Sequence, residues 1–395
     1  MLTRTVVFPI DLTEEQRKSL YKTIDLYSKA WNYCVDVAWK KNCLSKRKLH
    51  KETYYYLKTC YKLKSQYLCS SRDRAIEVVK AAKALERNGN IVSQPSSELI
   101  PIRLDRNTLS FDKERTRASV ATQDGRIKIQ LSWHRQAKKY ESWFCNSGEI
   151  GIDRRGRWVL RLIFTKEVNM PVRTNRICGA DRGIKHPIVL SNNKFYGESW
   201  WKEHERKLLL HIAILQSKGT RSAKRRLKKV WRRLRRFRED CDRVIAKQII
   251  ESLLPGDTIV LEILKNIISR CGTKGKAHKK HRAKMGRWSF KRLENAIRYN
   301  AELKGIYVET VSAHYTSQTC SKCGIICKKN RKSQAIYSCS CGLTLNADLN
   351  AARNIGNKWC EANGCASGPN VNRPIVAASF YNDASYKLPT SVGSS

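Results

Sequence analysis

Four cysteines between residues 320 and 341 constrain the fold of this chain more than any other feature. Cys320 and Cys323 form a C-x-x-C pair, and fifteen residues separate it from the C-x-C pair of Cys339 and Cys341. Two such pairs suit two short turns that close one tetrahedral thiolate site, the preferred geometry of structural zinc. We therefore predict one structural zinc ion on these thiols, against the alternative of four buried cysteines without a metal.

An acidic residue follows the predicted zinc site closely. Asp348 comes seven residues after Cys341, where apolar residues begin to recur at helical spacing. A zinc-binding segment that leads directly into an acidic helix start is more specific than either feature alone, and it favours a nuclease over a simple zinc finger. Taken alone, Asp348 or Asn346 would more often be a helix cap.

The charge of the chain indicates the class of its partner. The 395 residues include 78 Lys and Arg against 34 Asp and Glu, a formal net charge of +44. Such an excess repels itself in a compact fold unless a polyanion neutralises it, so we expect a nucleic acid partner. No apolar run approaches the ~18 residues that would span a bilayer, and no signal peptide is evident, so we expect an intracellular protein without a membrane partner.

The other cysteines support the same compartment. Eleven of the fifteen lie outside the two pairs, and scattered cysteines in a chain of this length are typical of reduced intracellular thiols. Cys327 follows Cys323 by four residues, but the two pairs already supply the four ligands of a tetrahedral site. We interpret Cys327 as a cysteine that the metal does not need.

The first 170 residues change from a strand pattern to helices and back. Residues 1–10 have the pattern of a strand, and Thr13 with Gln16 forms a capping box before a long amphipathic helix. Helical segments continue to about residue 87, where a Gly-, Asn- and Pro-containing linker begins. Residues 100–170 alternate as strands do, so we expect residues 1–10 to join them in one small barrel.

Further along the chain, a basic helical stretch is predicted over about residues 201–253. Its Lys and Arg doublets have almost no compensating acids, so a role at the phosphate backbone is favoured over a merely solvated face. The tyrosines at 54–56 suit core packing and base stacking equally well. His278 and His281, in a basic loop over 270–287, do not have metal-ligand spacing.

Three acids stand at the ends of predicted strands or helices in a chain with few acids. Asp181 follows an apolar strand, Glu262 closes the strand from Thr258, and Asp348 begins a helix. Three carboxylates that converge on one pocket suit two Mg²⁺ ions roughly 3.5–4 Å apart, which would hold the attacking water and the leaving oxygen of a phosphodiester. Oxygen ligands suit Mg²⁺ better than the nearby thiols do. Asp153 stands in a similar Gly-Ile-Asp context, but its position between two strands favours a hairpin turn.

These motifs resemble those of the TnpB family of transposon-encoded RNA-guided endonucleases, which are relatives of the compact type V CRISPR effectors. The resemblance is strong over residues 176–356, whereas the N-terminal half matches in layout only. The segments similar to the three RuvC motifs are Gly179-Ala-Asp181-Arg-Gly-Ile, Ile259-Val-Leu-Glu262-Ile-Leu-Lys-Asn and Ala347-Asp348-Leu-Asn-Ala-Ala-Arg-Asn-Ile. The departures are Ala180 and Arg182 in place of the family's frequent Ile and Leu, and a C-x-C second pair, and none of them replaces a catalytic carboxylate.

The resemblance implies an α/β multidomain fold. Its central part would be an RNase H-like (RuvC) nuclease domain with a zinc-ribbon insertion, beside a small β-barrel wedge domain that carries a helical recognition insertion. The implied boundaries are 1–10 and 98–172 for the wedge, 11–97 for the recognition insertion, 173–319 and 347–358 for the nuclease domain, and 320–346 for the zinc insertion. Residues 359–395, rich in Gly, Ser and Asn, are expected to be a disordered tail.

The resemblance also implies a function. A guide RNA from a transposon end or a CRISPR array would pair with double-stranded target DNA beside a short motif, and one RuvC site would cut each strand with two Mg²⁺ ions held by Asp181, Glu262 and Asp348. We would then expect a prokaryotic cytoplasmic protein associated with the nucleoid. The sequence favours neither a monomer nor a dimer.

Two other functions are considered beside this one. The first is a nuclease-inactive RNA-guided DNA-binding repressor, which the presence of all three acids argues against. The second is a transposase or a transposase-associated DNA-binding protein, which the zinc segment immediately before Asp348 argues against.

Overall fold

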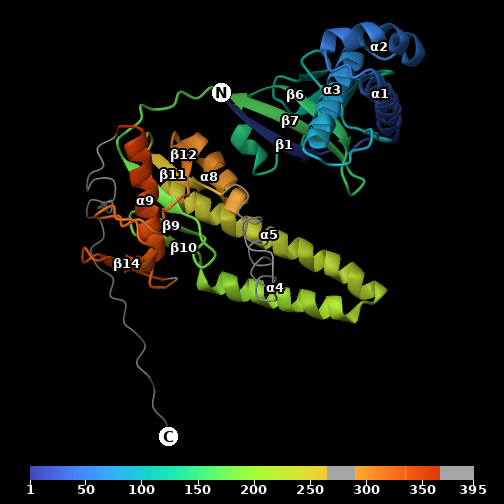
Figure 1. Ribbon diagram of the computed structural model, residues 1–395. Helices are drawn as coiled ribbons and strands as arrows, with labels where there is room; N and C mark the ends of the chain where they lie inside the picture. Colours follow the sequence, from blue (N-terminus) through green and yellow to red (C-terminus); the bar gives the residue numbers. More distant parts are fainter. Residues whose placement is uncertain (265–289, 334, 365–395) are drawn as a thin grey trace. The chain divides into compact units, whose positions relative to one another are not determined.

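The computed structural model describes residues 1–264, 290–333 and 335–364 of the chain. The chain divides into two compact units, Met1–Val168 and Asn169–Ser395 (Figure 1). Both units contain helices and sheets, which agrees with the predicted α/β multidomain class. The finer domain boundaries stay predictions.

The strands of the first unit form two antiparallel sheets. One has the order β1 (Leu2–Pro9), β7 (Trp158–Lys166), β6 (Phe144–Ile152), β2 (Ile102–Leu104), and the other contains β3 (Leu109–Phe111), β4 (Arg117–Thr122) and β5 (Gly125–Gln130). A short 3-10 helix, Ala137–Tyr140, precedes β6. β1 pairs with β7 along its whole length. The expected pairing of the N-terminal strand with strands after residue 100 is therefore confirmed.

Three helices lie between β1 and β2: α1 (Glu14–Lys40), α2 (Lys46–Tyr61) and α3 (Ser65–Arg87). α1 begins at the predicted capping box, in which the Gln16 backbone N–H donates to Thr13 Oγ1 at 3.3 Å and the Thr13 backbone N–H donates to Gln16 Oε1 at 3.1 Å. Its apolar face packs on the strands in one continuous core that includes Leu20, Tyr27 and Phe8.

The second unit is built on a five-stranded sheet of order β10-β9-β8-β11-β12. The strands are β8 (Ile177–Asp181), β9 (Ile188–Leu190), β10 (Phe195–Tyr196), β11 (Thr258–Ile263) and β12 (Tyr307–Ser312). β8, β9 and β10 pair antiparallel, whereas β11 pairs parallel to both β8 and β12. Because β8 and β11 are parallel neighbours, their C-terminal ends reach the same edge of the sheet.

Helices cover both faces of this sheet (Figure 1). α5 (Arg221–Glu251) and α8 (Phe290–Lys304) pack on the face that carries Cys178, Ala180 and Leu261. α9 (Ala347–Ala362) packs on the opposite face, against Ile177, Val260 and Val311. The sheet is buried on both sides, which explains the continuous apolar run of β11.

α9 approaches β8 so closely that a side chain does not fit between them. A Cβ atom built on Gly179 would lie 2.0 Å from the carbonyl oxygen of Ala352 and 2.6 Å from the backbone nitrogen of Gly356. A glycine is therefore required at position 179. This contact packs the middle of α9, at Ala352 and Gly356, directly on β8.

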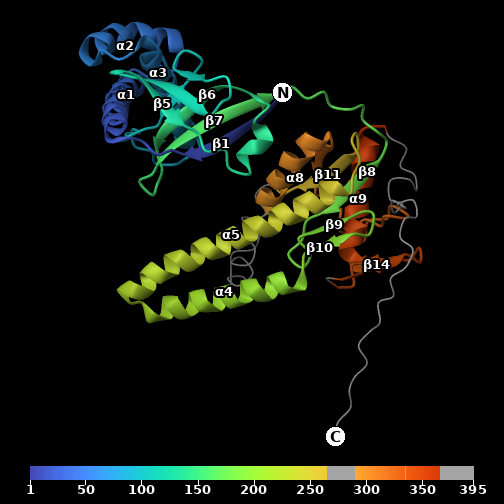
Figure 2. The same ribbon diagram turned by 180° about the vertical axis from the view of Figure 1, so that it is seen from behind.

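The predicted basic helix over residues 201–253 is two helices. α4 (Ser199–Lys218) ends at Gly219, which has φ 61° and forms its left-handed C-cap, and Thr220 caps α5 by accepting from the Ala223 backbone N–H at 3.2 Å. The two helices form an antiparallel hairpin, seen in Figures 1 and 2. Periodicity missed the break because both helices keep an apolar face toward each other.

The thiolate segment lies between β12 and α9. It contains a 3-10 turn, Lys328–Asn330, and a hairpin of β13 (Ile336–Ser338) and β14 (Thr344–Asn346). α9 continues to Ala362 and buries Trp359 and Cys360, so the prediction of a tail from residue 359 is wrong for its first residues. The rest of that tail beyond residue 364, and the loop with His278 and His281, lie outside the described residues.

Candidate acidic site and thiolate centre

The structure brings Asp181 and Glu262 to one edge of the sheet of the second unit. Asp181 is the last residue of β8, and Glu262 follows Leu261, the partner of Ala180 on the neighbouring strand β11. The Glu262 side chain is buried, with 8% of the residue exposed. Both carboxylates thus extend from the same end of two parallel strands.

Asp348 reaches this edge from a helix. It lies in the first turn of α9, whose N-cap is Asn346: Asn346 Oδ1 accepts from the backbone N–H of Asp348 at 2.9 Å and of Leu349 at 3.3 Å. The cap is therefore Asn346, and Asp348 is left free for another role. The body of α9 packs closely on β8 at Gly179, and the charge of Asp348 acts on Asp181, so Asp348 lies near the end of β8.

The electrostatics show that the three acids act on one another. Burial raises the pKa of Asp181 well above its usual range, and the negative charges of Glu262 and Asp348 raise it further. Burial also raises the pKa of Glu262, against the opposing charge of Arg182. Such a group of carboxylates is destabilising without cations, which makes it a candidate metal site.

Two arginines adjoin the acids. The Arg331 guanidinium lies 3.4 Å from Asp348 Oδ1, and its charge lowers the pKa of Asp181. The fully buried Arg182 side chain donates to the carbonyl oxygen of Phe290 at 3.1 Å, to Glu294 Oε2 at 3.1 Å and to the carbonyl oxygen of Glu262. In the sequence, Arg182 stands out only as a departure from the family's motif, and nothing marks Arg331.

The four predicted cysteines also meet. Their sulfur atoms all lie within 4.8 Å of one another, with Cys320 Sγ 3.6 Å from Cys341 Sγ and Cys323 Sγ 3.6 Å from Cys339 Sγ. Four sulfurs about 2.3 Å from one zinc ion at tetrahedral corners lie about 3.8 Å apart, so the group could hold a structural metal. The backbone N–H of Cys341 lowers the pKa of the Cys339 thiol to about 6. Against the backbone N–H of Ile325, burial and the other three sulfurs raise the pKa of Cys323 to about 12, so without a metal the thiols share their protons and do not all ionise. Cys327 is not part of the group.

Two asparagines join the thiolate segment to α9. Asn350 Oδ1 accepts from the Ser321 backbone N–H at 3.0 Å, and Asn350 Nδ2 donates to the Thr319 carbonyl at 2.7 Å. Asn354 Nδ2 donates to the carbonyl oxygens of Thr316 and Thr319. These contacts fix the first turns of α9, and hence Asp348, to the thiolate centre. These contacts were not predicted from the sequence, although two asparagines on an apolar helix were a usable signal.

Asp153 lies in the first unit, in the loop between β6 and β7. Its Oδ1 accepts from the backbone N–H of Arg155 at 2.7 Å and of Arg157 at 3.0 Å, and its Oδ2 accepts from the Arg157 guanidinium. The Arg157 backbone N–H is the main reason that the pKa of Asp153 falls to about 2. Its predicted turn role is confirmed.

The predicted cationic surface of α5 is exposed, and so is Tyr55, for which the sequence left core packing and base stacking open. The paired arginines and lysines of α5 from Arg225 to Arg236 are exposed, whereas Val230 and Leu234 pack against α4. Tyr55 is 76% exposed, which excludes a core role for that residue. No helix in the described part of the chain is long and apolar enough to cross a membrane.

The chain is similar in sequence to known nucleases. Residues 290–355 match the family model described as Cas12f1-like, TNB domain. The CRISPR-associated endodeoxyribonuclease Cas12f1 of Sulfoacidibacillus thermotolerans is 25% identical over 413 residues, which cover 89% of this chain and 95% of the relative. The putative RNA-guided DNA endonuclease InsQ of Escherichia coli is 28% identical over 51% of this chain and 53% of its own length.

The fold has a solved counterpart. The cryo-EM structure of a Cas12f1–sgRNA–target DNA complex superposes with a TM-score of 0.60 at 14% identity, covering 91% of this chain and 99% of that chain. TnpB-like proteins also match shorter parts of the sequence. The resemblance predicted from the motifs is thereby confirmed: the chain is a relative of the TnpB and Cas12f proteins.

Proposed function

We propose that this chain is an RNA-guided DNA endonuclease. It binds a guide RNA, recognises a short motif beside the double-stranded target, and hydrolyses DNA phosphodiesters at one acidic site. The observation that carries the proposal is the convergence of Asp181, Glu262 and Asp348 from β8, β11 and α9, where burial and then the charges of the other two acids raise the pKa of Asp181. The relatives are named as endodeoxyribonucleases and RNA-guided endonucleases, which supports the same activity.

The proposal assigns the five-stranded sheet and its helices to an RNase H-like (RuvC) nuclease domain. Its support is the strand order, with an antiparallel β8-β9-β10 meander beside two parallel strands, and the fold likeness to the Cas12f1 complex. The thiolate segment would be the zinc-binding insertion. In the first unit, the two sheets would form the wedge, and α1, α2 and α3 the recognition insertion.

The three carboxylates would hold two Mg²⁺ ions. When bound, these ions would supply an activated water and stabilise the leaving oxygen of the phosphodiester. Arg182 fixes Glu262 by binding its backbone carbonyl, and the Asn346 cap fixes Asp348. Arg331 places a positive charge beside Asp348 that would also attract a phosphate oxygen.

The four thiols would hold one structural zinc ion. A closed set of four cysteines leaves no open coordination position, so this metal would serve folding and not hydrolysis. Through Asn350 and Asn354, the thiolate segment would orient α9 and thus Asp348. The net charge of +44 would be neutralised largely by the guide RNA and the DNA. A prokaryotic cytoplasmic location near the nucleoid is the expected setting.

RNA co-purified with the full chain provides the test. The RNA is sequenced, its variable segment is replaced by a chosen guide, and the complex is incubated with a plasmid library that carries random bases beside the matching target. We expect Mg²⁺-dependent cleavage that follows the guide and requires one fixed adjacent motif. Equal cleavage of unmatched duplex DNA by RNA-free protein would contradict the proposal and indicate a nonspecific nuclease.

A further inference from the structure

The first turn of α2 has the opposite charge from the one that a helix start favours. Its first three residues are Lys46, Arg47 and Lys48, it contains no acid, and the N-cap Ser45 makes no side-chain hydrogen bond to the helix. The N-terminus of a helix carries a positive partial charge, so cations there are unfavourable and anions are stabilised. The start of α2 therefore suits an anionic ligand.

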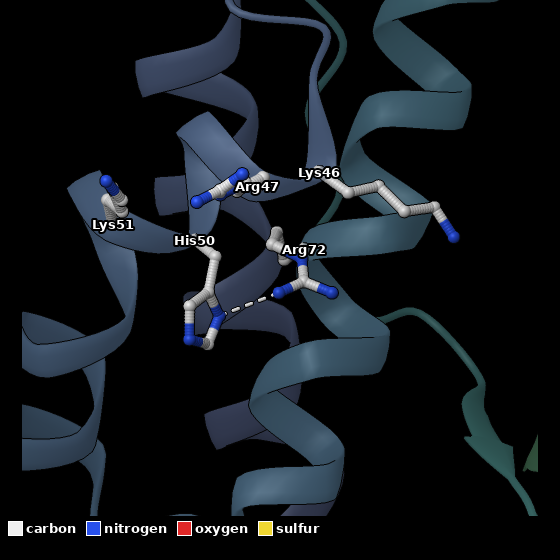
Figure 3. A pocket seen from close by; sticks show the side chains of 5 residues that line it. All are labelled: Lys46, Arg47, His50, Lys51 and Arg72. Carbon is white, nitrogen blue, oxygen red and sulfur yellow. Dashed lines mark hydrogen bonds between the residues drawn. The ribbon is translucent and has the colours of Figure 1, made fainter.

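Lys46 and Arg47 line a pocket together with two later residues of α2 and one residue of α3. The pocket has a volume of about 430 Å³ and is lined by Lys46, Arg47, His50, Lys51 and Arg72 (Figure 3). Arg72 Nη1 lies 2.7 Å from His50 Nδ1. Because a guanidinium can only donate, His50 Nδ1 must accept, which leaves Nε2 of the neutral ring as a donor. All five lining side chains thus offer hydrogen-bond donors.

The local acids do not neutralise the pocket. Asp73 is the carboxylate that pairs with its lining residues, at 2.6 Å from Arg72 Nη2 and 2.7 Å from Lys46 Nζ. Arg47 and Lys51 are exposed, and neither has an ion pair or a side-chain hydrogen bond within the described residues. The surplus positive charge is what a phosphate group would find.

Aromatic rings continue the same face of α2. Tyr54 and Tyr55 lie two helical turns after Lys46 and Arg47, about 12 Å along the helix. Tyr54 stacks on His50 with ring centroids 4.5 Å apart, and the largely exposed Tyr55 meets Tyr54 edge to face at 5.6 Å. Tyr54 is thereby held in place, and the exposed ring of Tyr55 lies one helical turn after Lys51.

We propose that this surface, made of Lys46, Arg47, His50, Lys51, Tyr55 and Arg72, binds an unpaired segment of RNA. The cationic pocket takes a phosphate, and Tyr55 stacks on a neighbouring base, the combination used for single-stranded nucleic acids. A duplex keeps its bases stacked on one another, so it offers none to Tyr55. The inference rests on the proposed function, which supplies the guide RNA as a ligand.

Ultraviolet cross-linking of the full chain identifies the ligand. The chain with its co-purified RNA is irradiated with and without matching target DNA, and the tryptic peptide Glu52–Lys58, which contains Tyr54 and Tyr55, is analysed by mass spectrometry. We expect a ribonucleotide adduct on this peptide in both samples. A deoxyribonucleotide adduct, or adducts on other peptides only, would overturn the proposal.

Salt dependence tests the cations separately from the ring. The affinity of the RNA-free chain for a fluorescent oligouridine of about 15 nucleotides is measured at several salt concentrations. The double variant Arg47→Ala, Lys51→Ala should reduce the slope of log affinity against log salt concentration by about 0.7 to 1.4, since each single-strand phosphate contact contributes about 0.7. The control is Arg17→Ala with Lys18→Ala, which removes two exposed cations of α1 in the same unit and should leave the slope unchanged. Equal slopes for both double variants would contradict the proposal.

Tyr55→Ala should weaken oligouridine binding roughly five-fold or more without changing the salt slope, and Tyr55→Trp should restore it. Unchanged affinity of Tyr55→Ala would contradict the stacking role.

Guided cleavage by the unaltered chain distinguishes a failure of this RNA-binding surface from a failure of the proposed endonuclease function. If cleavage follows the guide while the cross-link and the slopes fail, this surface is wrongly assigned and the proposed function stands. A ribonucleotide adduct on a chain without guided cleavage would support the RNA site and contradict the endonuclease.

Discussion

At the scale of single residues, the candidate site combines acids that repel one another with arginines that hold them in place. The three carboxylates and the four cysteines were predicted from the sequence, because each stands at a recognisable strand end, helix start or ligand spacing. The role of Arg182 was not, because its partner Glu294 lies 112 residues away in the chain and only the folded sheet and α8 bring them together. Long-range pairs of this kind leave no local sequence pattern.

Replacing Asp181 by Asn should stabilise the protein in the absence of Mg²⁺ and nucleic acid. The folded pKa of Asp181 is raised, so the unaltered protein loses stability as the pH rises from the unfolded pKa, about 3.9, through the folded value. An uncharged amide removes both the cost of burying the carboxylate charge and its repulsion from Glu262 and Asp348. We expect the melting temperature at neutral pH to rise by about 2 °C or more in Mg²⁺-free buffer.

Asp153→Asn is the matched control for that melting experiment. The pKa of Asp153 is lowered to about 2, so its stabilising effect is present above the unfolded pKa and is lost as the pH falls toward about 2. This variant should therefore melt at a lower temperature at neutral pH. Equal destabilisation by Asp181→Asn would show that Asp181 is a structural acid.

Arg182→Leu should destabilise the second unit by about 3 kcal/mol or more. The substitution removes three hydrogen bonds of a buried guanidinium, to the carbonyl oxygens of Phe290 and Glu262 and to the Glu294 carboxylate, which keeps Lys291 and Arg298 as partners. Each buried acceptor that loses its donor costs about 1 kcal/mol or more. Urea denaturation followed by tryptophan fluorescence measures the loss. Arg206→Ala, which removes an exposed ion pair with Glu203, should cost less than about 1 kcal/mol. Similar costs for the two variants would contradict the buried role of Arg182.

At the scale of secondary-structure elements, the site depends on how α9 is held. Gly179 lets the helix approach β8, and Asn350 and Asn354 tie it to the thiolate segment. The helix itself was predicted, but its end was placed too early, at residue 358, because the residues that follow have a loop-like composition. In the structure α9 continues to Ala362 and Trp359 is buried. The α4–α5 hairpin was read as one helix because Gly219 alone marks the break.

Purified protein should contain one zinc ion per chain, and Cys341→Ser should lose most of it. The sulfur atoms of Cys320, Cys323, Cys339 and Cys341 lie close enough together to bind one zinc ion, and zinc binding supplies folding free energy to such segments. Metal analysis by inductively coupled plasma mass spectrometry gives the stoichiometry. Cys327→Ser should retain full zinc, because Cys327 lies outside the quartet. Zinc-free protein under reducing conditions, or equal zinc loss in both variants, would contradict this assignment.

At the scale of the whole molecule, the fold follows from contacts between distant segments, and the net charge determines how the chain binds nucleic acids. Alternation predicted that residues 1–10 join the strands after residue 100, and the family resemblance implied the α/β class. The order of strands within the sheets was not predictable, since it depends on contacts between distant segments. The net charge of +44 follows directly from the composition and affects every nucleic-acid binding assay of this protein. Without RNA, the chain should bind nucleic acids with little sequence preference.

Guide RNA should raise the melting temperature of the chain, and this gain should shrink as salt increases. Neutralised phosphates release condensed counterions, so affinity falls steeply with salt concentration. Differential scanning fluorimetry with and without co-purified RNA, at about 0.1 M and about 0.5 M salt, measures the effect. A gain that does not change with salt would contradict the electrostatic account.

The central claim is that Asp181, Glu262 and Asp348 form one hydrolytic site, and a comparison of Asp348→Ala with Asp153→Ala tests it most directly. Both variants are assembled with the same guide RNA, and cleavage of a matching plasmid is measured in Mg²⁺ under single-turnover conditions. We predict that Asp348→Ala binds RNA and target DNA normally but cleaves at least about a thousand-fold more slowly, a barrier increase of roughly 4 kcal/mol. Asp153→Ala should retain its cleavage rate. Normal cleavage by Asp348→Ala together with loss of cleavage by Asp153→Ala would contradict the account.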